Sequence, residues 1–162
     1  MYKNFVVHPQ IVLSGHLAGC AASMQGKFVQ FRHDWWDKAF KPYADARDPS
    51  KLGMDTIMAM VKDLGMDEAK FKADMNSQTC KDRVKADMDE LEKWHVNATP
   101  SFFINGRSFA WDGTPDSFKG FIDDELKKAE SSGVPCADYY EKEVMGKGLK
   151  TFRSKKEAQG GG

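Results

Sequence analysis

The chain has 162 residues, enough for one domain with a sizeable core, and 41% of them are apolar, which favours a globular protein over a disordered one. Lysine and arginine together number 24, as do aspartate and glutamate, so the net charge is +0 and gives no case for nucleic acid or an anionic membrane as partner. No apolar run reaches the ~18 residues that a membrane-spanning helix needs.

The first half of the chain predicts one short strand followed by a helical block. Lys3–Val7 is expected to be a strand that ends at His8-Pro9, and the run from Pro42 to Pro49 is expected to be a loop. Apolar residues at three- and four-residue spacing predict five helices, the third over about 54–64 and the fifth over about 79–95. Their inner faces are expected to hold, helix by helix, Leu13, Leu17, Cys20, Ala21 and Met24; Phe28, Phe31, Trp35 and Phe40; Met54, Ile57, Met58 and Val61; Phe71 and Met75; Val84, Met88 and Leu91.

The second half predicts a hairpin and then a helix. Strands are expected at 101–104 and 107–111, because Asn105-Gly106 between them suits a type I′ turn, which needs positive φ at both central residues. Thr114-Pro115 predicts an N-cap and first helical residue, and a short last helix is expected over 137–145. The helix after Pro115 should bury Phe118, Phe121, Ile122 and Leu126. The tail from about 151 to 162 is basic and then glycine-rich, and it is expected to be disordered.

The cysteines and histidines are few and widely spaced. The three cysteines are Cys20, Cys80 and Cys136, and the simplest interpretation of their spacing is three free thiols in a reducing compartment. Cys20 is expected to be buried and inert, whereas Cys80 near a helix start and Cys136 after a proline are the candidate reactive thiols. No metal or other cofactor is expected, because the spacing of the cysteines and of His8, His16, His33 and His95 fits no metal site.

Thr99-Pro100, followed by an apolar strand and an Asn-Gly turn, resembles the cis-proline loop and hairpin of thioredoxin-fold proteins, particularly the DsbA-like thiol–disulfide oxidoreductases. Lys3-Asn4-Phe5 with His8-Pro9 resembles that family's second strand, and 16–28 resembles the start of its helical insertion. The resemblance implies an α+β, mostly helical fold over about 1–150. This would be an incomplete thioredoxin-like fold with a helical insertion at about 10–95 and a C-terminal hairpin plus helix.

Members of this family carry a first strand and a Cys-x-x-Cys helix, and the sequence contains no Cys-x-x-Cys. The resemblance therefore implies a truncated member, in which Thr99 and Pro100 are a vestige of the substrate loop and no catalytic residue remains. A sheet without its interior strand leaves unpaired edges, so a homo-oligomer is expected, a dimer or larger, with the N-terminal segment or hairpin swapped between copies.

Two functions stay open at this point. The first is a catalytically silent scaffold or binding protein that forms oligomers. The second is a thiol–disulfide oxidoreductase that uses cysteines outside a Cys-x-x-Cys motif, or a Cys-x-x-Cys upstream of this chain. The family is mostly extracytoplasmic, whereas a native start at Met1 would leave no export signal and predict a cytoplasmic protein.

Overall fold

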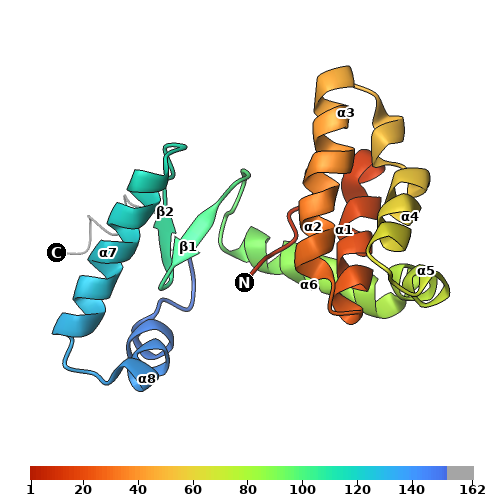
Figure 1. The fold of residues 1–162 in the computed structure, drawn as a ribbon. Helices are drawn as coiled ribbons and strands as arrows, with labels where there is room; N and C mark the ends of the chain where they lie inside the picture. Colours follow the sequence, from red (N-terminus) through yellow and green to blue (C-terminus); the bar gives the residue numbers. More distant parts are fainter. Residues whose placement is uncertain (153–162) are drawn as a thin grey trace. The chain divides into compact units, whose positions relative to one another are not determined.

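The computed structural model describes residues 1–152 and forms two compact units, which divide between Leu91 and Glu92. We call residues 1–91 the helical unit and the described residues from Glu92 onward the hairpin unit (Figure 1). The tail at 151–162 is expected to be disordered, and residues 153–162 of it lie outside the described residues. None of the helices in residues 1–152 is both long enough and apolar enough to cross a bilayer.

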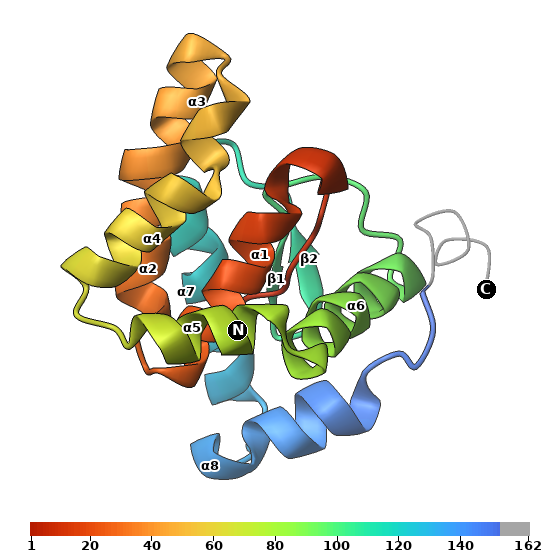
Figure 2. The ribbon, with the colours of Figure 1, turned by 90° about the vertical axis from the view of Figure 1, so that its right-hand side faces the viewer.

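The helical unit is built from a succession of short helices. They are α1 (Pro9–Met24), α2 (Phe28–Asp34), α3 (Lys41–Ala46), α4 (Met54–Asp63), α5 (Glu68–Asn76) and α6 (Gln78–Lys93), the last of which leads out of the unit. A π-helical stretch, Trp35–Phe40, joins α2 to α3, and a 3₁₀ turn, Pro49–Leu52, precedes α4. Figure 2 shows α3 at the end of this unit away from α5 and α6.

The core of the helical unit is apolar and closely packed. It is made of alanines from α1 together with large side chains from α2, α4 and α5, among them the fully buried Phe31, Ile57 and Phe71. Gly15 of α1 allows this packing, because a Cβ at that position would overlap the indole ring of Trp35. The periodicity of the sequence thus placed most inner faces correctly, although Leu13, Met24 and Met54 are exposed.

Two expectations for this unit are wrong. Lys3–Val7 forms no strand, since it pairs with neither strand of the described sheet. The backbone N–H groups of Asn4 and Val6 donate to the side chains of Asp87 and Met88 of α6 instead of to a neighbouring strand. The expected loop at 42–49 is in part α3, which begins at Lys41 with Pro42 in its first turn, where proline is tolerated, and ends before Arg47 in a left-handed conformation.

The hairpin unit contains β1 (Phe102–Ile104), β2 (Arg107–Phe109), α7 (Pro115–Ser131) and α8 (Cys136–Tyr139), which continues as a π-helical stretch, Tyr140–Met145. The strands are antiparallel, with Phe102 opposite Phe109 and Ile104 opposite Arg107. Asn105 and Gly106 both have positive φ, at 49° and 75°, which confirms the predicted turn.

Aromatic side chains hold the hairpin against α7. The ring of Phe118 lies 4.8 Å from the rings of both Phe102 and Phe109, edge to face, and Phe121 lies 4.7 Å from Phe109. The expectation that Ile122 and Leu126 are buried is wrong, since both are about half exposed. They lie on α7 beyond the aromatic stripe that faces the hairpin.

Candidate functional site

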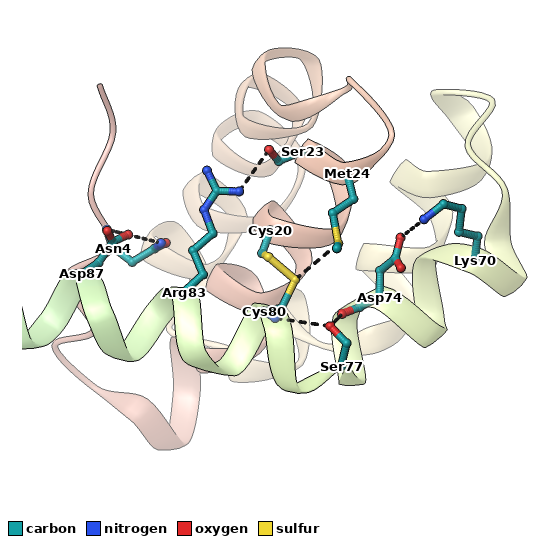
Figure 3. The surroundings of a disulfide bond; sticks show 10 residues. All are labelled: Asn4, Cys20, Ser23, Met24, Lys70, Asp74, Ser77, Cys80, Arg83 and Asp87. Carbon is teal, nitrogen blue, oxygen red and sulfur yellow. Dashed lines mark hydrogen bonds and ion pairs between the residues drawn. A yellow bond between two sulfur atoms is a disulfide. The ribbon is translucent and has the colours of Figure 1, made fainter.

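A disulfide between Cys20 of α1 and Cys80 of α6 is the main candidate site (Figure 3). Its Cα atoms lie 5.7 Å apart although 60 positions separate the two residues in the chain. Cys80 is completely buried and Cys20 is 6% exposed. The expectation of three free thiols is therefore wrong. Cys20 is buried as expected, but Cys80 carries no thiol in this state.

The local structure explains why Cys80 lies where it does. Ser77 caps α6, because its hydroxyl accepts the backbone N–H of Cys80 at 3.2 Å and donates to the carbonyl of Asp74 at 2.6 Å. Cys80 therefore lies in the first turn of α6, as the sequence suggested. The Sδ atom of Met24, a half-exposed residue at the end of α1, lies 3.9 Å from Cys80 Sγ and covers it.

A polar network lies further along α6 and ties the N-terminal segment to it. The carboxylate of the buried Asp87 accepts the backbone N–H of Asn4 at 2.9 Å and the side-chain amide of Asn4 at 2.6 Å. Its other oxygen lies 3.1 Å from Lys3 Nζ, which also donates to Glu90 at 2.7 Å. The network takes the place of strand pairing for these residues.

Two side chains of this network, Asp87 and His16, have shifted pKa values. Burial alone would raise the pKa of Asp87, but hydrogen bonds from the Asn4 backbone, Lys3 and the Asn4 side chain outweigh it, so the pKa lies below the ordinary 3.8. Burial lowers the pKa of His16, against an opposing effect of the Asp87 charge. His16 is therefore neutral at pH 7, and its Nδ1 donates to Asn4 Oδ1 at 2.9 Å.

The Thr99-Pro100 loop belongs to the hairpin unit. The peptide between the two residues is cis, and both are exposed. Ser101, which follows them, closes a local turn by donating from its hydroxyl to the carbonyl of Ala98 at 2.6 Å. In the described residues β1 pairs only with β2, so its other edge has no strand partner.

Cys136 is an exposed free thiol at the start of α8. It lies at the rim of an open recess of about 360 Å³, whose other lining residues are Leu126, Ala129, Glu130, Val134, Tyr139 and Tyr140. Among residues 1–152 the structure brings together no group of three or more histidine, cysteine, aspartate or glutamate side chains that could hold a metal ion.

The comparisons with known proteins agree with this fold. The sequence profile of a family described as thioredoxin matches residues 1–124, so the chain belongs to the thioredoxin family. Within it the chain is DsbA-like. It is 30% identical over 112 residues to a protein of Bacillus cereus named "Probable disulfide bond formation protein D", which covers 67% of this chain and 51% of that protein. It is 40% identical over 63 residues to a protein of the same name from Bacillus anthracis, 39% of this chain and 28% of that protein.

The chain therefore spans about half the length of the first of these relatives. No solved structure matches the chain significantly. The fold class and the family resemblance expected from the Thr99-Pro100 segment are confirmed.

Sequence reasoning missed the pairing of Cys20 with Cys80. The signal was present in two separate observations, because Cys20 shares the apolar face of its helix and Cys80 starts another helix. Only the crossing of α1 and α6 brings the two sulfurs together, and spacing along the chain does not reveal such a crossing.

Proposed function

We propose that this chain takes part in protein disulfide bond formation as the substrate-binding portion of a DsbA-like thiol–disulfide oxidoreductase, and that its own three cysteines do not carry out the exchange. Thr99 and Pro100 would contact an extended substrate backbone beside the unpaired edge of β1. The name shared by the two Bacillus relatives supports a part in disulfide bond formation, and the exposure of the Thr99-Pro100 loop supports a role in substrate binding.

The state of the cysteines supports the second half of the proposal. An exchange-active dithiol needs an accessible, low-pKa thiolate with a partner sulfur close by. Cys20 and Cys80 are buried in a disulfide, and Cys136 is the free thiol. The exchange would then depend on a dithiol from elsewhere in the oxidoreductase system. A disulfide inside the chain also favours an oxidising, extracytoplasmic compartment over a cytoplasmic one.

The first test measures catalysis directly. The chain should not accelerate the reduction of insulin by dithiothreitol, and the Cys136→Ser variant should behave identically. Turnover that Cys80→Ser abolishes would contradict this half of the proposal and would make Cys80 the reactive thiol.

The second test measures substrate binding. A fluorescent, reduced insulin B chain should bind the wild-type chain, and Phe103→Asp should weaken that binding because Phe103 is half exposed on β1 next to the loop. Ser108→Asp, opposite Phe103 on β2, is the matched control and should bind normally. Equal binding by wild type and both variants would place the peptide elsewhere and contradict the proposed role of the loop.

An oligomeric scaffold is the second candidate function. Exposed apolar side chains on α7, Ile122 at 47% and Leu126 at 54%, favour it, because such groups in the same helix suit an interface between copies. A dimer or larger closed oligomer, with or without exchange of the N-terminal segment or the hairpin, should appear in light scattering at micromolar concentration. A stable monomer of 18.2 kDa would remove this candidate and leave the first candidate function unaffected.

A further inference from the structure

Helix α6 contributes little to the apolar core of the helical unit. The main core cluster comes from α1 to α5 and from the segments that connect them, whereas α6 adds the buried Cys80 and Val84 outside that cluster. The buried residues of α6 are Cys80, Val84 and Asp87, of which only Val84 is an ordinary apolar side chain. The strongest single link between α6 and the rest of the unit is therefore the covalent one to Cys20.

The remaining contacts of α6 are polar or peripheral. Arg83 approaches the hydroxyl of Ser23 at 3.4 Å, Met24 lies over Cys80, and the Asp87 network binds the N-terminal segment (Figure 3). That segment reaches α1 through the hydrogen bond between Asn4 and His16, and Tyr2 packs against Phe28 and Arg32 of α2. Hydrogen bonds of this kind stabilise a docked helix modestly, because water competes for the same groups.

We propose that the Cys20–Cys80 disulfide is a redox-cleavable tether, and that its reduction releases α6 and the N-terminal segment from a helical core that stays folded. The tethered and released states differ in one covalent bond, the burial of Val84 and a few polar contacts. The apolar contacts of α1 with α2, α4 and α5 are the same in both.

The reductant belongs to the class of dithiols, and the reaction balances in two steps. A thiolate of the dithiol attacks Cys20 Sγ, the S–S bond breaks, and Cys80 leaves as a thiolate that takes up a proton. The second thiolate of the dithiol then attacks the mixed disulfide and releases Cys20, which is protonated in turn. Two electrons and two protons pass to the pair, and the dithiol becomes a disulfide.

The surroundings favour attack on Cys20 over attack on Cys80. Cys80 is completely buried under Met24, whereas Cys20 retains a small exposed area. Cys80 also lies in the first turn of α6, where the partial positive charge of the helix end stabilises a leaving thiolate. Since both sulfurs are nearly enclosed, the tether resists brief exposure to thiols and opens under sustained reduction.

Hydrogen–deuterium exchange of the full chain tests the tether, with Cys136→Ser as background so that no third thiol interferes. Dithiothreitol is the dithiol probe. Reduction should raise amide exchange in 78–93 and in 1–8 by about tenfold or more, while the amides of α4 and α5 change little. The Cys20→Ala/Cys80→Ala variant should give the same pattern without reductant. If that variant does not fold, the test rests on amide exchange in the reduced Cys136→Ser chain.

Asp87→Asn in the oxidised state provides the matched comparison. This variant should raise amide exchange in residues 1–8. The amides in the first turn of α6 should stay protected from exchange, because the disulfide is intact. Two outcomes of reduction would overturn the proposal. Unchanged exchange in 78–93 would mean that the noncovalent contacts suffice, and an equal rise throughout α1 to α5 would mean that the disulfide holds the whole unit together.

Discussion

The two units of this chain are stabilised in different ways. The helical unit has a core of fully buried apolar side chains and a disulfide. In the described part of the hairpin unit, by contrast, the one residue classed as buried is a carboxylate, Glu125, which is paired with Lys128 at 2.6 Å and with Arg107 at 3.5 Å. Its aromatic residues are only partly covered. The unit that exposes the Thr99-Pro100 loop thus keeps its apolar side chains partly accessible, whereas the other unit fully buries a set of them.

The largest expected effect is that of truncating the core of the helical unit. Phe71→Ala should lower the free energy of unfolding by about 3–5 kcal/mol, because Phe71 is fully buried against Phe31. The matched change in the hairpin unit, Phe118→Ala, should cost about 1–3 kcal/mol, because Phe118 is only partly buried. Urea unfolding followed by circular dichroism measures both. Equal losses would mean that the two units are packed equally well.

Reduction of the disulfide comes next. Because the cross-link closes a loop of 60 positions, its loss should weaken the attachment of α6 to the rest of the helical unit by about 2–4 kcal/mol, while α1 to α5 stay folded. The hairpin unit, which contains neither cysteine of the pair, should unfold at the same urea concentration with or without reductant.

Thiol titration is the control for that experiment. The native chain should show one reactive thiol, Cys136, and the reduced and denatured chain should show three. Two or more fast thiols in the native, oxidised protein would be inconsistent with the disulfide.

Substitutions of two glycines, one in each unit, test the same difference in packing with smaller expected changes in stability. Gly15→Ala should destabilise the helical unit by about 1–3 kcal/mol, because the new methyl group overlaps the ring of Trp35. Gly120→Ala in α7 should instead stabilise the hairpin unit by about 0.5–1 kcal/mol, since its Cβ meets open space and alanine is the better helix former. Thermal melts of the two variants decide the question, and a stabilising Gly15→Ala would show that the contact with Trp35 is not close.

The last prediction concerns Asp87, whose contribution to stability depends on pH. Its pKa is lower in the folded chain than in the unfolded chain, so the carboxylate contributes stability that is fully present above about pH 4. This contribution is lost as the pH falls through the lower, folded-state pKa. Asp87→Asn should therefore cost about 1–2 kcal/mol at pH 7 and progressively less in more acidic solution. Urea unfolding at a series of pH values measures the difference. A constant difference across that range would exclude the charged network as its source.

The sequence by itself determined the local structure and the family. Helical spacing of apolar residues located the helices, Asn105-Gly106 located the hairpin turn, and Thr114 with Pro115 located the start of α7, because each depends on neighbours a few positions away. The Thr99-Pro100 segment pointed to the thioredoxin family for the same reason, since its motif is contiguous in the chain.

Only the tertiary structure decided what depends on distant residues. The pairing of Cys20 with Cys80 and the docking of Asn4 on Asp87 each join positions more than fifty residues apart, where spacing carries no information. Lys3–Val7 has strand-forming residues but is not a strand, because a strand exists only with a partner and the partners offered by the fold are side chains of α6. Ile122 and Leu126 fit the helical pattern of a buried face, yet both are about half exposed, and the members of that pattern whose rings pack on the hairpin are Phe118 and Phe121.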